Sequence, residues 1–246
     1  MLRSRIIPVL LIHDKGLVKT RQFGEHKYVG DPVNAVKIFN EKEVDELVLL
    51  NIDATSQGHE PDYEQLRQIA IESRMPLSYG GGIKTANQAA KIIALGFEKV
   101  SVSAAALARP ELICEMAEQV GRQSVVVTVD VRKGGLLGGY SIYSHNARQK
   151  AKPSLLEFIT QAADLGAGEI VINSIDRDGM MQGYDLKLAK MVRDAVTVPL
   201  SFVGGAGSTS HMAELIDSVG ICGAAAGSMF VLKGTFRAVL ISYARP

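Results

Sequence analysis

The chain has 246 residues, of which 47% are hydrophobic and 22% charged, and its formal net charge at pH 7 is +1. This composition is typical of a compact folded protein and allows one large α/β domain or two small ones. The balanced charge favours neither a nucleic-acid nor a membrane partner. No apolar run approaches the roughly 20 residues that span a bilayer. Cys114 and Cys222 lack metal-ligand spacing, so we expect buried thiols, a cytoplasmic protein, no metal and no cofactor.

Segments with strand-like and helix-like patterns alternate along the chain. Short apolar runs predict eight strands, at 6–11, 46–52, 77–79, 99–102, 124–130, 169–173, 200–203 and 224–226. Apolar residues at helical spacing predict helices at 62–73, 155–165, 186–194 and 211–219, and Thr85 with Gln88 forms a near capping box. Eight such units predict a single closed (β/α)₈ barrel, the TIM barrel, over 1–246. An open doubly wound sheet is the alternative.

The two halves of the chain resemble each other. Gly80-Gly81-Gly82 is echoed by Gly204-Gly205-Ala206-Gly207 at an offset of 204 − 80 = 124, and Gly96 is echoed by Gly220 at the same offset. A period of half the chain predicts a two-fold duplicated barrel with half-barrels of roughly 1–120 and 121–246.

Two segments are longer than ordinary connections. Residues 13–30 follow the first strand and residues 132–153 follow the fifth, so both belong to the face where the strands end. The second is rich in lysine and arginine. Each is interpreted either as a mobile solvated loop or as a lid over an anionic ligand.

Glycine-rich turns after the third and seventh strands are candidate anion sites. Glycines such as Gly81, Gly82, Gly205 and Gly207 let backbone N–H groups approach a phosphate closely, although tight turns between strand and helix need glycine anyway. Segments 101–105 and 226–228 offer a second pair of such turns. Two related sites predict a ligand with two phosphates.

Four aspartates end strands or follow them: Asp53, Asp130, Asp176 and Asp178. An aspartate at this end of a barrel strand can act as a general acid or base. Capping of the next turn explains Asp53 and Asp176 well, and Asp130 is the best catalytic candidate because it directly follows an apolar strand. Lys19 could neutralise a phosphate or polarise a carbonyl, or be solvated.

Charged residues of alternating sign stand at the starts of four strands. They are Arg5, Glu46, Lys99 and Glu169, and a barrel would place them together at the face opposite the catalytic loops. The simplest interpretation is a stabilising salt-bridge ring.

These motifs together resemble the HisF family, the cyclase subunit of imidazole glycerol phosphate synthase, over nearly the whole chain. The matching segments, which are highly specific together, are 5–7, 30–32, 45–48, 80–83, 99–101, 125–127, 168–170, 174–179 and 204–207. The resemblance implies a barrel paired with a glutaminase subunit, with Glu98 at the interface, and an ammonia gate made of Arg5, Glu46, Lys99 and Glu169. It further implies a phosphorylated ligand. Its binding residues would be Lys19, Gly81, Gly82, Ser103, Asp178, Gly179, Gly205, Gly207, Gly227 and Ser228.

The resemblance fails at one catalytic position. The family pattern has two catalytic aspartates, of which the second is Asp130, while the first is replaced by Leu11. Asn51 and Ser103-Ala104 also depart from the pattern. Leucine transfers no proton, so cyclisation of the histidine-pathway substrate is expected to be severely impaired.

The chain is similar to HisF paralogues associated with amidation of surface-polysaccharide sugars, in which a glutaminase, the barrel and a sugar amidotransferase cooperate. The matching segments are 10–20 and 237–243. This resemblance implies a subunit that accepts ammonia and supports formation of an acetamidino sugar. One alternative is a true cyclase whose first acid is Asp14 or another group. Another is a module that only activates the glutaminase.

Overall fold

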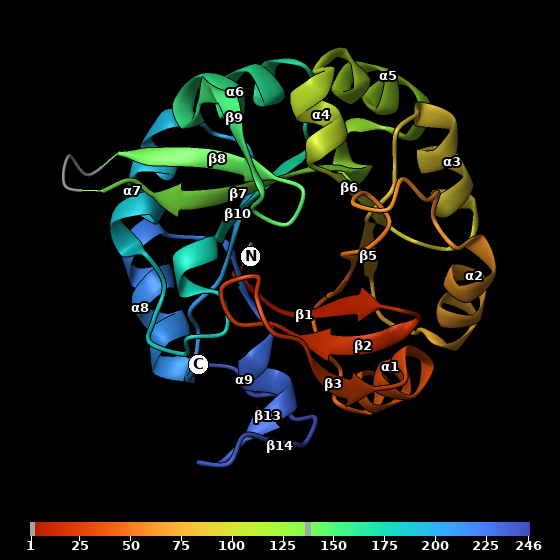
Figure 1. The fold of residues 1–246 in the computed structure, drawn as a ribbon, viewed down its shortest axis with the longest axis vertical. Helices are drawn as coiled ribbons and strands as arrows, with labels where there is room; N and C mark the ends of the chain where they lie inside the picture. The colour runs from red at the N-terminus through yellow and green to blue at the C-terminus, as the bar shows by residue number, and fades with distance from the viewer. Residues whose placement is uncertain (1–2, 136–138) are drawn as a thin grey trace.

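The computed structural model describes residues 3–135 and 139–246, and its central feature is a closed barrel of eight parallel strands (Figure 1). Each strand pairs with two neighbours, and the last pairs with the first, as Arg5↔Gly223 and Ile6↔Ala224. The barrel strands are β1 (Arg5–His13), β4 (Leu47–Asn51), β5 (Leu77–Gly80), β6 (Lys99–Val102), β7 (Val125–Lys133), β10 (Glu169–Ser174), β11 (Leu200–Val203) and β12 (Gly223–Ala226). The predicted (β/α)₈ barrel is confirmed, and the open sheet is excluded.

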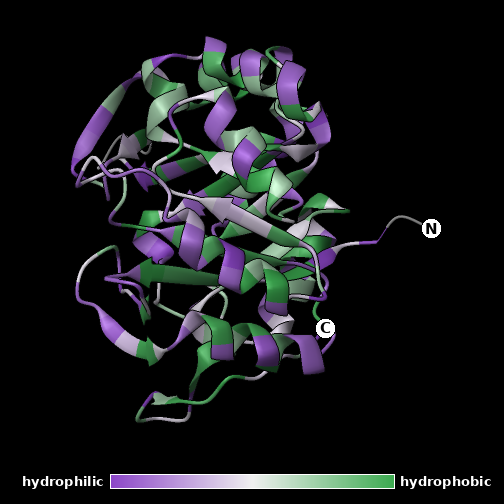
Figure 2. Ribbon diagram, turned by 90° about the vertical axis from the view of Figure 1, so that its right-hand side faces the viewer, coloured by the Kyte–Doolittle hydropathy of each residue, from purple (hydrophilic) through white to green (hydrophobic). Residues whose placement is uncertain are grey.

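Helices form a ring outside the strands, with hydrophilic residues on their outer faces (Figure 2). All four helices predicted from apolar spacing are present, and the capping box of Thr85 with Gln88 is confirmed. The helices are α1 (Pro32–Glu41), α2 (Tyr63–Glu72), α3 (Ala86–Ala94), α4 (Ala104–Ala108), α5 (Glu111–Val120), α6 (Leu155–Asp164), α7 (Leu186–Ala195), α8 (Thr209–Val219) and α9 (Ser228–Val231). Short 3₁₀ turns lie at Arg122–Ser124 (η1) and Ile175–Arg177 (η2).

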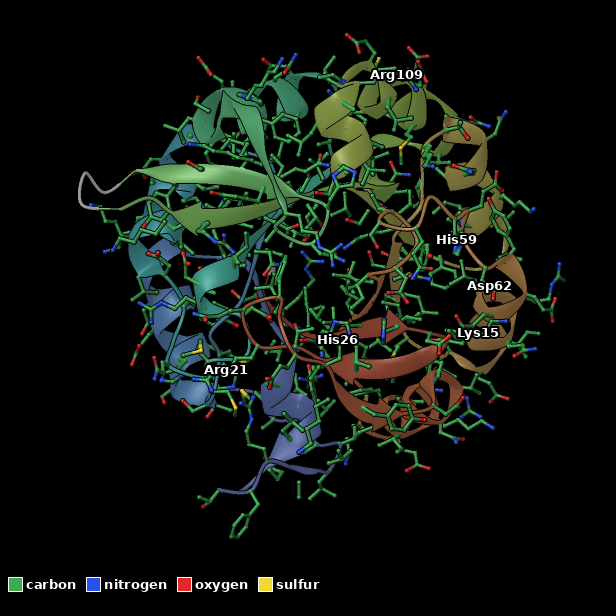
Figure 3. The ribbon with its side chains drawn as sticks, viewed as in Figure 1. Lys15, Arg21, His26, His59, Asp62 and Arg109 are labelled. Atoms are coloured by element: carbon green, nitrogen blue, oxygen red, sulfur yellow. The ribbon has the colours of Figure 1, made fainter. Side chains whose placement is uncertain are left out.

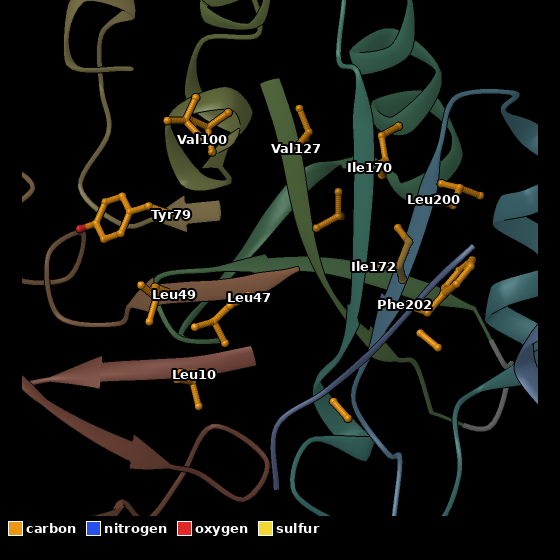
Figure 4. Close-up of a cluster of buried hydrophobic side chains, with 14 of the residues drawn as sticks. Leu10, Leu47, Leu49, Tyr79, Val100, Val127, Ile170, Ile172, Leu200 and Phe202 are labelled. Carbon is orange, nitrogen blue, oxygen red and sulfur yellow. The ribbon is translucent and has the colours of Figure 1, made fainter. Parts of the chain in front are cut away.

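Most of the hydrophobic core lies between the strands and the helices. Alternate residues of each strand point outward into it, such as Leu10, Leu49 and Val127, as Figure 4 shows. The opposite faces of the strands fill the barrel interior, where a smaller apolar cluster contains Ile7, Val9 and Ala225. This alternation decides which residues reach the barrel axis.

The two long segments are strands rather than loops. After β1, the chain forms β2 (Gly16–Lys19) and β3 (Lys27–Gly30), and after β7 it forms β8 (Tyr140–Ser144) and β9 (Gln149–Ser154). All four continue the barrel sheet by antiparallel pairing. The interpretation as solvated loops is therefore wrong for these residues, because main-chain hydrogen bonds hold them. Residues 136–138 of the predicted 132–153 segment lie outside the described residues.

The chain after β12 takes an irregular path. Helix α9 is followed by the two-stranded sheet of β13 (Leu232–Lys233) and β14 (Ala238–Val239). The Tyr243 hydroxyl then donates to the carbonyl of Ile6, 3.0 Å away. Cys222 is buried as expected, but Cys114 is partly exposed on α5, so that half of the cysteine prediction is wrong. Over residues 3–135 and 139–246, every helix is too short or too polar to cross a membrane.

Candidate functional site

Four charged side chains close the barrel where its strands begin. Arg5 donates to Glu46 and, at 2.6 Å, to Glu169. Lys99 Nζ donates to Glu46 at 2.9 Å and to Glu169 at 3.0 Å. Each carboxylate therefore contacts two cations, and each cation contacts two carboxylates. The four residues predicted to lie together form this ring, which we call the charged ring.

Burial and charge act in opposition within the charged ring. Burial works to raise the pKa of Glu169, but the positive charges of Lys99 and Arg5 outweigh it and hold that pKa below its ordinary value. For Glu46 the effect of burial prevails, and its pKa is raised. Ser201 also donates to Glu169. The side chains of Glu46 and Glu169 are each only 6% exposed, so this ring is well shielded from solvent.

Glu98 directly precedes β6 and is exposed at the same end of the barrel as the charged ring. This location is compatible with the predicted partner interface, which stays a prediction.

A small cavity of about 30 Å³ lies between the charged ring and the opposite end of the barrel. Glu46 and Glu169 line it at one end, and Val9, Leu50 and Val203 line its walls. The wall residues Val9, Leu50, Ser101, Thr128, Asn173 and Val203 also line a larger cavity above it. The two cavities therefore follow one another along the barrel axis.

The larger cavity, of about 540 Å³, opens where the strands end and has the size of a site for a small molecule. We call it the mouth cavity. Most of the predicted ligand residues line it: Lys19, Gly81, Gly82, Ser103, Asp130, Asp178, Gly179, Gly227 and Ser228. Gly205 and Gly207 do not. A side chain at either position would collide with the carbonyl of Gly183 or Met181, so these two glycines admit a neighbouring loop.

Asp130 extends from the end of β7 into the mouth cavity. Its Oδ1 accepts a hydrogen bond of 2.8 Å from Asn173 on the adjacent strand β10. Burial raises the pKa of Asp130 to about 6, the nearby Asp178 adds to the rise, and the bond from Asn173 opposes it. A carboxyl with such a pKa can both accept and donate a proton near neutral pH.

Leu11 lies across the barrel from this acid, near the end of β1. It packs on the inner apolar cluster and pairs in register with Leu50, and both side chains line the mouth cavity. Asn51 Oδ1 instead accepts hydrogen bonds of 3.0 Å from the backbone of Asp53 and Ala54 and thereby holds a turn. Asp130 therefore faces the mouth cavity from β7, while the equivalent position on β1 presents the apolar Leu11.

Two of the predicted phosphate positions, Gly81 and Gly82, lie against neighbouring backbone, as Gly205 and Gly207 do, but Gly81 and Gly82 also line the mouth cavity. Gly81 and Gly82 have φ angles of 123° and 75°. A Cβ on Gly81 would lie 2.4 Å from the carbonyl oxygen of Asn51. The nearby Ser103 Oγ is buried and has no hydrogen-bond partner within the described residues, so it is available to a ligand.

Lys19 is buried at the edge of the mouth cavity, only 5% exposed. Its Nζ donates to the backbone carbonyl of Val9 and lies close to Gly227, where a Cβ would come within 2.6 Å of it. Burial lowers the pKa of Lys19 to about 8, against the opposing charge of Asp178. Asp178 Oδ2 in turn accepts hydrogen bonds from Thr20 at 2.7 Å and from Phe23 N at 3.2 Å.

A cluster at the rim of the mouth cavity was missed by the sequence reasoning. His13 Nδ1 lies 2.7 Å from Asp53 Oδ1, and its ring meets that of His26 edge-on at 4.3 Å. His26 lines the cavity and lies over β1 and β2 in Figure 3. The signal was the position of His13, two residues beyond Leu11 and on the same side of β1.

Asp14 lies outside the mouth cavity. It occupies the turn between β1 and β2 with a φ of 45°, and its backbone N–H donates to Asp53 at 2.8 Å. Its side chain is absent from the cavity lining. The structure therefore argues against Asp14 as the replacement for the missing acid.

Comparison with known proteins places this barrel in a family. The family model described as "Histidine biosynthesis protein" matches residues 5–237. The chain belongs to this family. A provisionally named imidazole glycerol phosphate synthase subunit, hisF3 of Vibrio vulnificus, is 55% identical over 246 residues, which cover 100% of this chain and 95% of the relative.

Relatives of two kinds match over nearly their full lengths. The provisionally named hisF2 subunit of Pseudomonas aeruginosa is 51% identical over 99% of this chain and 96% of its own length. The imidazole glycerol phosphate synthase subunit HisF of Streptococcus sanguinis is 39% identical over 94% of this chain and 91% of its own length. The resemblance to HisF and its paralogues is thus confirmed.

Proposed function

We propose that this protein is the HisF-type subunit of a glutamine amidotransferase complex, which receives ammonia from a glutaminase partner and supports amidination of a surface-polysaccharide sugar. The single observation that carries the proposal is the unequal pair at the mouth cavity, where Asp130 faces the cavity from β7 and Leu11 from β1. A general acid or base typically contributes roughly 10²- to 10⁴-fold to a rate. Losing one such group weakens cyclisation while leaving the remaining parts of the barrel intact.

The barrel interior supports an ammonia path. The charged ring, the small cavity and the mouth cavity follow one another along the axis and share wall residues such as Leu50 and Val203. Ammonia is neutral and small, so a wall of mostly apolar residues with a few hydroxyl and amide groups suits its passage better than that of an ion. Opening the charged ring would admit it from the end that bears Glu98.

The proposed ligand of the mouth cavity is a phosphorylated small molecule. Gly81, Gly82 and Ser103 would bind one anionic group, and Gly227 and Ser228 another, with Gly205 and Gly207 shaping the turn beside the second. A sugar amidotransferase is the proposed third component, because the acetamidino sugar itself would be formed there.

The proposal is tested by supplying purified protein with ammonium and the histidine-pathway ribonucleotide. We expect no imidazole product above background, and we expect Leu11→Asp to raise any trace activity by 10-fold or more, roughly the lower range of acid–base catalysis. The double variant Leu11→Asp/Asp130→Asn is the matched control and should lose that gain. Ring closure by the unaltered chain at a biosynthetic rate would overturn the proposal.

A cyclase of histidine biosynthesis is the second candidate, because the chain shares 39% identity with the HisF of Streptococcus sanguinis. The same assay decides between them. A pure glutaminase activator would stimulate glutamine hydrolysis by its partner, and product formation by the complete system would be unaffected by Asp130→Asn.

A further inference from the structure

Lys19 differs from the other lysine of the mouth cavity in its surroundings. Lys84 also lines this cavity but is exposed, and its Nζ lies 3.5 Å from the carbonyl oxygen of Gly58. Lys19 is buried, and its amine donates to the carbonyl of Val9, a neutral group. Within the described part of the chain, no salt bridge joins Lys19 to a carboxylate.

We propose that Lys19 is a nucleophile that forms an imine with the aldehyde or ketone carbon of a phosphorylated ligand in the mouth cavity. A neutral amine that donates one N–H to Val9 keeps its lone pair free, and Lys19 lines the mouth cavity, with its amine packed against Gly227, which has no side chain. Desolvated lysines are the ones that form imines, because burial disfavours the charged ammonium. The phosphate of the ligand would lie against the backbone of Gly81 and Gly82 or of Gly227 and Ser228.

The charged groups around Lys19 are consistent with this role. Asp178 faces it from the loop after β10 and is engaged by Thr20 and Phe23, while Arg237 from the C-terminal segment acts on Asp178 in turn. Asp130 shares the mouth cavity from β7. Burial lowers the pKa of Lys19 to about 8, so a substantial fraction of the amine is neutral in mildly alkaline solution.

The chemistry balances without an oxidant or a reductant. The Lys19 nitrogen forms a bond to the carbonyl carbon and gives up one proton to the carbonyl oxygen, which takes a second proton from solvent and leaves as water, so that a protonated imine remains. This next step rests on the proposed function: ammonia attacks the imine carbon, a proton passes from the ammonia nitrogen to the lysine nitrogen, and the bond between Lys19 and that carbon breaks. The ligand leaves as its own imine and carries the ammonia nitrogen. This route activates a carbonyl where Leu11 offers no acid.

The experiment uses D-glyceraldehyde 3-phosphate as the probe, with sodium cyanoborohydride to reduce any imine to a stable amine. Peptide mass spectrometry of the full chain should show one saturable adduct at Lys19. Lys19→Met should lose the adduct, whereas Lys84→Met is the matched control and should retain it. The rate of labelling should rise with pH and level off above about 8, and unphosphorylated glyceraldehyde should label at least 10-fold more slowly.

Two results would overturn the proposal: equal labelling of Lys84 and Lys19, or unchanged labelling in the Lys19→Met variant. Retention of the far-ultraviolet circular dichroism spectrum by both variants establishes that they are folded. Because the probe needs no glutaminase, the outcome is independent of ammonia transfer. Failure of the labelling leaves the proposed function standing, and failure of ammonia transfer leaves the imine at Lys19 standing.

Discussion

The two ends of the barrel differ in how their ionisable groups are paired. At the charged ring, Glu169 and Glu46 each contact both Lys99 and Arg5; the pKa of Glu169 stays below its ordinary value, whereas burial still raises that of Glu46. At the mouth cavity, Asp130 is partly buried and Lys19 is buried, and within the described residues neither has a salt-bridge partner. The pKa of Asp130 rises to about 6 and that of Lys19 falls to about 8, so both shift toward the neutral form.

This difference teaches what pairing does to a buried charge. Burial penalises the charged form in both places, and only a nearby opposite charge compensates for it. Where the opposite charges outweigh burial, as at Glu169, the group stays charged and its ion pairs stabilise the fold. Where they do not, the group exchanges protons near neutral pH and becomes available for chemistry.

The largest expected effect comes from replacing a carboxylate by an amide at each end of the barrel. Glu169→Gln leaves Lys99 and Arg5 with an uncompensated buried charge, and we expect it to lower the free energy of unfolding by about 4 kcal/mol. Asp130→Asn removes a carboxylate that burial disfavours and should leave stability equal or higher at pH 7. Urea denaturation measures both. An equal loss of stability in both variants would contradict the claim that Glu169 is compensated by ion pairs and Asp130 is not.

Two lysines provide the next test. Lys19→Met removes a buried cation and should raise the free energy of unfolding at pH 7 by about 3 kcal/mol, since each pKa unit corresponds to about 1.4 kcal/mol. Lys99→Met should lower it, because Glu46 and Glu169 lose a partner.

The pH dependence of the Lys19→Met effect follows from linkage. The folded protein releases the Lys19 proton near pH 8 and the unfolded chain only near its ordinary pKa of 10.5, so in this interval the unfolded chain binds more protons. The wild-type protein therefore gains stability as pH rises, and the advantage of Lys19→Met should shrink between pH 8 and 10.5. An advantage that stays constant over this interval would contradict the assignment.

A smaller effect is expected in acid. Asp130 has a folded-state pKa of about 6 against an ordinary 3.8, so its contribution to stability is present below pH 3.8 and is lost as pH rises through 6. We expect this loss to be about 2 kcal/mol, because the carboxyl contacts the mouth cavity and part of its cost is screened. Glu169 acts with the opposite sign, since its lowered pKa makes its contribution disappear as pH falls. Urea unfolding at different pH values measures both effects. In the Asp130→Asn variant, the loss of stability as pH rises through 6 should disappear, whereas the loss caused by Glu169 as pH falls should remain.

The smallest effect concerns the hydrogen bond from Asn173, which favours ionised Asp130. Asn173→Ala should raise the pKa of Asp130 by about one further unit, or about 1.4 kcal/mol. The measurement is the midpoint of the Asp130-dependent stability change. Ser101→Ala is the control, because Ser101 bonds to Thr128 at 2.6 Å and not to Asp130. A shift of the same size in the control would refute the role of Asn173.

Sequence reasoning predicted the barrel well for a physical reason. Buried parallel strands and amphipathic helices carry their periodicity in the chain itself, so all eight barrel strands were located. It did not predict the strands β2, β3, β8 and β9 within 13–30 and 132–153, because their main-chain hydrogen bonds leave little trace in the side-chain pattern. The assignment of Gly205 and Gly207 to the ligand site stays a prediction; neither lines the mouth cavity, and each lies against a neighbouring backbone carbonyl.

By itself, the sequence determined the strand order and the four members of the charged ring, since each follows from residue type and position along a strand. The interpretation of Leu11 as a replaced acid came from the resemblance to HisF and stays a prediction. Only the tertiary structure decided how each charge is compensated. It brought Lys99 between two carboxylates, directed Lys19 to a neutral carbonyl, and assembled His13, Asp53 and His26 from three separate segments. Compensation of charge depends on distances across the barrel, and no pattern along the chain contains them.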